Sequence, residues 1–141
     1  MNLYAESSAV LAWLLGEEDG NRVREFLSGA ELVTASDLTL IECDRVLLRA
    51  VVLGEIDEAT ASDRRARLNA AAAHWHLWRL TPTIVDRATH SFPREPIRTL
   101  DAIHLASALE VRTSLPGVDL LSLDDRIRQA GEQLGFRLQP R

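Results

Sequence analysis

Short apolar segments alternate with longer amphipathic segments along this chain, and this alternation constrains the fold more than any other feature. Five apolar runs have the length of buried strands: residues 3–5, 32–34, 76–80, 118–122 and, at an edge, 136–138. Segments with helix-forming composition separate them. Strands that alternate with helices predict an α/β domain around a central, mainly parallel sheet of four or five strands flanked by helices.

Capping residues and glycines give the expected ends of the helices. Ser7 or Ser8 is expected to cap a helix that Gly16 stops, and Thr99 to cap an apolar helix through about residue 111. Thr81 and Pro82 form an N-cap followed by proline at the first helical position. Further helices are expected over residues 21–27, 37–53, 57–73 and 124–134. No repeat or linker interrupts the pattern, so we expect a single domain over residues 1–141.

The composition is that of an ordinary globular protein, with 46% hydrophobic and 26% charged residues among 141. No apolar run approaches the roughly 20 residues that span a bilayer. The first residues lack the features of a signal peptide, so we expect a cytoplasmic protein with no membrane association. The single cysteine, Cys43, fits a reducing compartment and a small packing role in its helix.

The charge balance is acidic, with a formal net charge of −5. Such a balance is unusual for a protein that binds nucleic acid, but a pocket of carboxylates that holds a cation would account for part of it. All basic residues are arginine, because the sequence contains no lysine. Receiver domains and haloacid-dehalogenase phosphatases use a lysine near the phosphoryl group, and its absence argues against both classes.

Three acidic residues stand where a strand passes into a helix or where a helix begins: Glu6, Asp101 and Asp124. Ligands of open α/β sheets bind beyond the carboxyl ends of the strands, where the strand order reverses. Each acid alone is also explained as a helix cap or first-turn residue. Glu42, taken alone, is explained as a helical ion-pair partner of Arg45 or Arg49.

Other kinds of site find less support. The four histidines do not pair with the cysteine in any zinc-like spacing, and Ser7-Ser8 lacks the flanking glycines of a nucleophile elbow. His104, three residues after Asp101, is expected to be a packed or partly exposed histidine of an apolar helix. Trp75 and Trp78 are expected in the core or in an interface.

Four segments follow one another over roughly residues 3–137: YAESSAVLAWL, SDLTLIECDRVLLR, IRTLDAIHLASALE and LLSLDDRIRQAGEQLGF. In this order they resemble the four motifs of PIN-domain ribonucleases, the third in the form found in bacterial VapC toxins. Their acidic positions fall on Glu6, Glu42, Asp101 and Asp124. The family usually has Asp at the first position, and Glu6 adds one methylene to that arm.

The resemblance implies a PIN-like three-layer fold and a Mg²⁺- or Mn²⁺-dependent endoribonuclease that cleaves single-stranded or loop RNA. It implies that Glu6, Asp101 and Asp124 hold the metal, with Glu42 completing the cluster or orienting water. Ser8 is then expected to support the first acid, and Arg98, with Arg94 and Arg126, to contact RNA.

The resemblance also implies the toxin of a type II toxin–antitoxin pair, whose partners are a cognate antitoxin and a second copy of the chain. A catalytically degraded PIN scaffold that serves as an RNA- or protein-binding module is the alternative.

Overall fold

The structure, a computed structural model, describes residues 1–141 and contains five strands and seven helices. The strands are β1 (Asn2–Ala5), β2 (Leu32–Ser36), β3 (His76–Trp78), β4 (Asp119–Leu121) and β5 (Leu138–Gln139). The helices are α1 (Ser7–Leu15), α2 (Gly20–Gly29), α3 (Asp37–Val52), α4 (Glu58–Ala72), α5 (Pro82–Ala88), α6 (Thr99–Ser114) and α7 (Asp125–Gln133).

The five strands form one parallel sheet in the order β3-β2-β1-β4-β5, which confirms the predicted fold class. The chain builds the sheet outward from β1 through β2 to β3, and then returns to the other side of β1 with β4. Ala5 pairs with Leu121, so β1 and β4 end side by side where the strand order reverses. Residues that follow these two strands therefore meet at one edge of the sheet.

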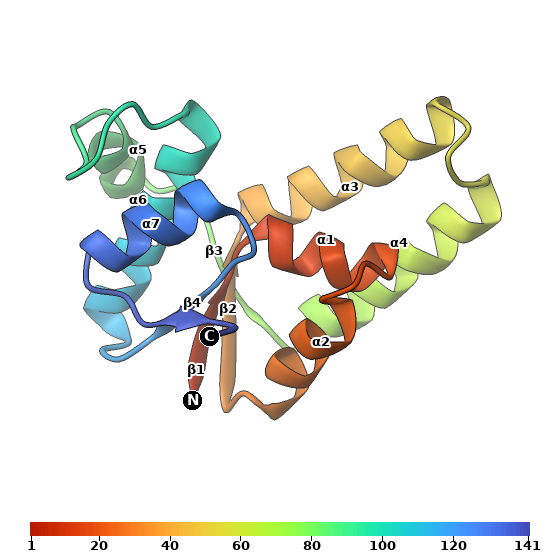
Figure 1. The fold of residues 1–141 in the computed structure, drawn as a ribbon, viewed down its shortest axis with the longest axis horizontal. Coiled ribbons are helices and arrows are strands. Elements are labelled where there is room, and N and C mark those ends of the chain that lie inside the picture. The colour runs from red at the N-terminus through yellow and green to blue at the C-terminus, as the bar shows by residue number, and fades with distance from the viewer.

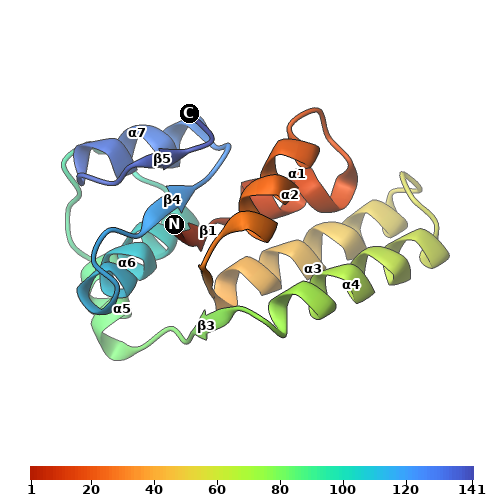
Figure 2. The same ribbon diagram turned by 90° about the horizontal axis from the view of Figure 1, so that it is seen from below.

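Helices cover both faces of the sheet and give the domain three layers. Figure 2 shows α1, α2, α3 and α4 on one side of the strands, with α5, α6 and α7 on the other. Side chains alternate along β1: Leu3 and Ala5 pack with Leu121 in the core beneath α1–α4, and Tyr4 packs with Leu120 in the core beneath α5–α7. Trp75 packs against the first core and Trp78 against the second.

Helices α3 and α4 form a hairpin that projects beyond the sheet (Figure 1). Its far end exposes apolar side chains, among them Leu48, Val52 and Leu53. Cys43, nearer the sheet, is fully buried as predicted, and its burial raises the pKa of the thiol to about 12. No helix in the structure combines the length and apolar character needed to cross a bilayer.

The sequence-based expectations for two helix starts are wrong by one or two residues. Glu6, not Ser7 or Ser8, is the N-cap of α1, and its side chain accepts a hydrogen bond from the backbone N–H of Ser8. Arg98, not Thr99, is the N-cap of α6. In both cases the capping residue is the last one with extended backbone, and that conformation defines the position.

The expected edge strand is also displaced. Residues 136–138 were expected to form it, but β5 begins at Leu138. Phe136 instead packs into the core beneath α6, with the guanidinium of Arg112 stacked 4.4 Å from the centre of its ring.

Candidate active site

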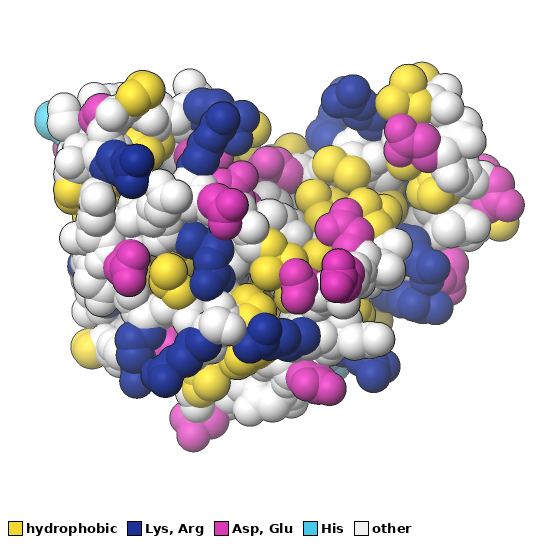
Figure 3. Space-filling view, viewed as in Figure 1, with side chains coloured by type: hydrophobic (Ala, Val, Ile, Leu, Met, Phe, Trp, Pro, Cys, Tyr) yellow, Lys and Arg dark blue, Asp and Glu magenta, His cyan; other side chains and the backbone are white.

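All four acids of the matched motifs line one pocket of about 460 Å³. Glu6 follows β1, Glu42 lies on α3, Asp101 in the first turn of α6, and Asp124 immediately before α7. Ser7, Ser8 and Arg98 line the same pocket. Figure 3 shows a hollow between the α3–α4 hairpin and the opposite part of the molecule, with acidic side chains at its edge.

Glu6 is held by a set of serine donors. Its side chain is only 3% exposed, and Oε1 accepts from Ser7 Oγ at 2.8 Å and from the Ser8 N–H at 3.1 Å. Oε2 accepts from Ser122 Oγ at 2.7 Å and from Ser8 Oγ. Both carboxylate oxygens therefore have two donors within the chain, which fixes the orientation of this group.

Ser8 links the first acid to the segment that carries the fourth. Its Oγ accepts from the N–H of Leu123 at 2.9 Å and from that of Asp124 at 3.1 Å. Since both lone pairs of the hydroxyl are engaged, its proton is directed to Glu6. The side chain of Ser8 thus contacts both the first acid and the segment that carries the fourth.

Glu42 is held from the opposite side by His104. The Nε2 atom of His104 lies 2.5 Å from Glu42 Oε1, and Ser7 Oγ, whose proton is directed to Glu6, lies 3.1 Å from the same oxygen. Partial burial alone would raise the pKa of Glu42, but the hydrogen bond and charge of His104, with the nearby hydroxyl of Ser7, outweigh it and hold that pKa below its usual range. Glu42 is therefore stabilised as a carboxylate. Both contacts are made by Oε1, so Oε2 remains available to a ligand.

The other two acids share one cation. Arg98 Nε donates to Asp101 Oδ2 at 3.2 Å, and Arg98 Nη2 lies 4.0 Å from Asp124 Oδ2. The second oxygen of Asp124 caps α7, because Oδ1 accepts from the N–H of Arg126 at 2.9 Å and of Ile127 at 3.1 Å. The cap and the pocket thus use different oxygens of one carboxylate.

The acids meet in one pocket, but they do not point at a single ion. No three Asp, Glu, His or Cys side chains are grouped closely enough to hold a metal as they stand. The reason lies in the partners of each acid: Glu6 is turned to its serines, and Asp101 and Asp124 are turned to Arg98. The donor chemistry still fits Mg²⁺, which prefers carboxylate oxygens, and Glu42 Oε2 faces no internal donor.

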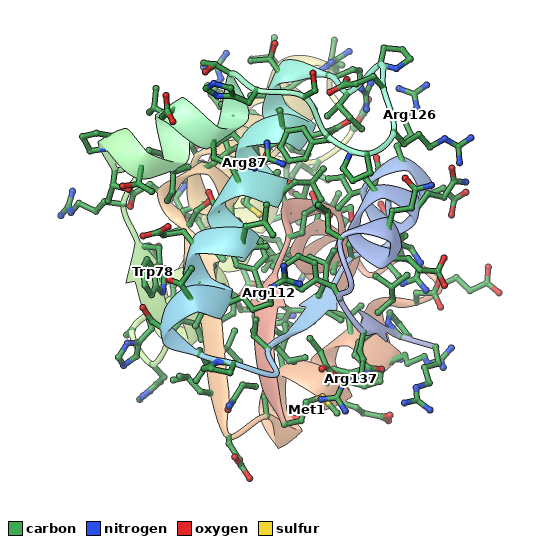
Figure 4. The ribbon with its side chains drawn as sticks, turned by 90° about the vertical axis from the view of Figure 1, so that its left-hand side faces the viewer. Met1, Trp78, Arg87, Arg112, Arg126 and Arg137 are labelled. Carbon is green, nitrogen blue, oxygen red and sulfur yellow. The ribbon has the colours of Figure 1, made fainter.

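Sequence reasoning missed three functional neighbours of the acids: Ser7, Ser122 and His104. His104 was expected only to pack, yet it is 1% exposed with polar partners on both ring nitrogens. Its spacing from Asp101 was the available signal, since residues three apart share one face of a helix. Arg94 and Arg126 do not line the pocket, and Arg126 points outward at the surface (Figure 4).

The domain has a parallel sheet, and four carboxylates gather where its strand order reverses. These features define a class of α/β domains with an acidic pocket at the carboxyl ends of the strands. The sequence profile of the PIN domain family matches residues 3–133. The chain belongs to this family, and each motif acid identified from the sequence lies in the pocket.

Curated relatives share nearly the whole chain. Ribonuclease VapC46 of Mycobacterium tuberculosis (strain ATCC 25618 / H37Rv) is 34% identical over 137 residues, covering 95% of this chain and 93% of its own. Ribonuclease VapC45 of M. tuberculosis (strain CDC 1551 / Oshkosh) is 26% identical over 138 residues, covering 98% and 94%.

Solved structures share the fold at low sequence identity. M. tuberculosis VapC20, described as a Sarcin-Ricin loop cleaving toxin, superposes with a TM-score of 0.65 at 16% identity, covering 92% of this chain and 95% of its own. VapBC2 of Rickettsia felis, bound to a DNA fragment from its promoter, gives a TM-score of 0.66 at 9% identity, covering 99% and 98%.

Proposed function

We propose that this chain is a Mg²⁺- or Mn²⁺-dependent endoribonuclease that cleaves single-stranded or loop RNA and acts as the toxin of a type II toxin–antitoxin pair. The observation that carries the proposal is the meeting of Glu6, Glu42, Asp101 and Asp124 in one pocket at the point of strand reversal. The names of the curated relatives, which are ribonucleases, support the same reaction class.

In this proposal Asp101, Asp124 and Glu6 hold the metal, and Glu42 completes the cluster or orients the attacking water. A bound divalent cation supplies charge neutralisation at the phosphate and a water that is easier to deprotonate. Glu6 acts from a fixed orientation, because four donors hold it, and Ser8 couples that orientation to the segment carrying Asp124. Arg98, which lines the pocket, would contact the RNA backbone.

The proposed partners follow from the same pocket and from the relatives. An acidic site attracts basic side chains, which a cognate antitoxin would place across it. The relatives named VapC and the neighbouring VapBC2 structure support a partner of this kind. We also propose a homodimer through apolar helix surface away from the acids, for which the Trp-containing segment, with its exposed Leu77 and Leu80, offers candidate contact area, and a cytoplasmic location.

Cleavage of defined RNAs by purified, antitoxin-free protein tests the proposal. We expect cleavage with Mg²⁺ or Mn²⁺, products that carry a 5′-phosphate, and loss of activity in Asp101→Asn. The Asn side chain keeps size while removing a charge that binds metal. Asp86→Asn, an exposed site on α5, is the control and should retain activity.

Two results would reject the proposal. Undiminished cleavage by Asp101→Asn, or in excess EDTA, would reject the metal mechanism. Absence of cleavage with every divalent metal, together with intact RNA binding, would favour the degraded scaffold instead.

A further inference from the structure

We infer that Arg98 is an internal competitor for the catalytic metal: its guanidinium pairs with Asp101 and Asp124 in the metal-free protein and must leave when a divalent cation binds. This inference rests on the proposed function, because it assigns the regulation of that same site. It accounts for the orientation of Asp101 and Asp124, two of the acids that share the pocket without forming a ready group of metal ligands.

The geometry places one cation between two acids from separate elements. Arg98 precedes α6 and reaches Asp101 in the first turn of that helix, with 3.2 Å between Nε and Oδ2. Its Nη2 lies 4.0 Å from Oδ2 of Asp124 at the start of α7. The cap of α7 engages only Oδ1 of Asp124, so the oxygen that faces Arg98 is the one left for the pocket.

Among the side chains that hold the four acids, Arg98 is the most exposed. The hydroxyl of Ser122 and the ring of His104 are 0% and 1% exposed, so neither can leave Glu6 or Glu42 without a change in the core. The side chain of Arg98 is 63% exposed and accounts for both ion pairs on the Asp101–Asp124 side. Its removal to solvent disrupts no packed core.

Electrostatics favour the exchange once a divalent cation is present. Exposed ion pairs stabilise a protein only slightly, because water screens them and the long side chain loses rotamer freedom. A divalent cation carries twice the charge of the guanidinium and binds carboxylate oxygens directly. Without either cation, Asp101 and Asp124 would face each other with no compensating charge, which increases their attraction for metal.

The chain offers a matched control in Arg126. This arginine lies two residues after Asp124, is exposed, points outward in Figure 4, and takes part in none of the ion pairs. Arg126→Gln changes the net charge by the same amount as Arg98→Gln. If the two variants differ in their affinity for Mn²⁺, the difference is due to direct competition at the carboxylates, because the change in net charge is the same in both.

Calorimetric titration of the metal-free protein with Mn²⁺ alone tests the inference without reference to activity. We expect Arg98→Gln to bind Mn²⁺ about three- to ten-fold more tightly than the wild type, because the competing ion pairs are gone. Arg126→Gln should stay within about two-fold of the wild type, and Arg98→Lys should lie between the wild type and Arg98→Gln, because it keeps the charge but not the forked geometry.

The outcomes separate this inference from the proposed function. Mn²⁺ binding by the wild type with equal or weaker binding by folded Arg98→Gln overturns the competitor role and leaves the metal site standing. Equal tightening in Arg126→Gln also overturns it. Failure of all the variants and the wild type to bind Mn²⁺ rejects the metal site and the competitor together.

Discussion

His104 Nε2 lies 2.5 Å from Glu42 Oε1, and this hydrogen bond joins α6 to α3 across the pocket. The other ring nitrogen, Nδ1, lies 3.2 Å from the hydroxyl of Tyr4, which comes from β1. A buried imidazole thus connects three elements and fixes the direction of one acid. His104 is a positioning residue for Glu42, since it contacts the carboxylate and lies beneath the pocket.

Replacement of His104 should reduce RNA cleavage through Glu42. We expect His104→Ala to lower kcat by about ten- to hundred-fold with a smaller change in KM, a range typical for partners that orient active-site ligands. His104→Gln should recover part of the loss, because its amide can still donate to Glu42. Steady-state kinetics on a defined RNA measure both. Exposed His90→Ala serves as the control, and wild-type kcat in His104→Ala would contradict the positioning role.

The lowered pKa of Glu42 predicts how acid affects stability. Because the pKa in the folded protein lies below the ordinary value of 4.5, the ionised side chain stabilises the fold above that pH. This contribution is lost as the pH falls through the lowered pKa. The stability advantage of the wild type over Glu42→Gln, measured by urea unfolding, should therefore be constant near neutral pH and shrink as the pH falls below 4.5. An advantage that stays constant or grows in acid would show that the hydrogen bonds to Glu42 do not favour its charged form.

Glu6 is predicted to be structural as well as functional. Its carboxylate accepts from four donors, and Ser8 Oγ could not accept from an amide N–H at this position because two backbone N–H groups already use that oxygen. An amide at this position places an N–H against a donor in either orientation, so Glu6→Gln should lower the free energy of unfolding by about 1–3 kcal/mol. Urea unfolding measures the change, with exposed Glu18→Gln as the control. An unchanged midpoint would mean that the serine cluster is not built around the acceptor.

Replacement of Glu6 by Asp tests whether the shorter side chain usual in the family works at this position. Glu6→Asp removes the methylene that distinguishes this chain from the usual motif, and the resemblance predicts retained or increased cleavage. The serine contacts of Glu6 predict a second effect, a loss of stability, because a shorter arm withdraws from Ser122. An RNA cleavage assay and urea unfolding of Glu6→Asp measure the effect on activity and the effect on stability separately.

The sequence was sufficient to predict those features that depend on residues close to one another in the chain. The strand–helix alternation predicted the α/β class, and the acids at strand ends and helix starts predicted where Glu6, Asp101 and Asp124 would meet. Those positions are set by neighbours in the chain. The direction in which each carboxylate points is set by partners far away in sequence, such as Ser122 for Glu6.

The pairing of Glu42 was not predictable for the same reason. On α3 it has Arg45 and Arg49 within helical reach, and the local expectation was an ion pair with one of them. The structure instead pairs it with His104, which is 62 residues away, because α3 and α6 meet beside the end of β1. Only the tertiary arrangement shows that a histidine expected to pack is a polar partner of the site.

Comparison of Asp124→Asn with Asp125→Asn for RNA cleavage in Mg²⁺ tests the central claim most directly. The two residues are adjacent, but Asp124 lines the pocket and Asp125 begins α7 outside it. Asparagine keeps the capping oxygen at position 124, so the fold should persist in both variants. We predict that Asp124→Asn lowers kcat/KM by about a hundred-fold or more, with Asp125→Asn within about three-fold of the wild type and EDTA abolishing all cleavage. Equal activity of the two variants, or cleavage that persists in EDTA, would contradict a metal-dependent nuclease site in this pocket.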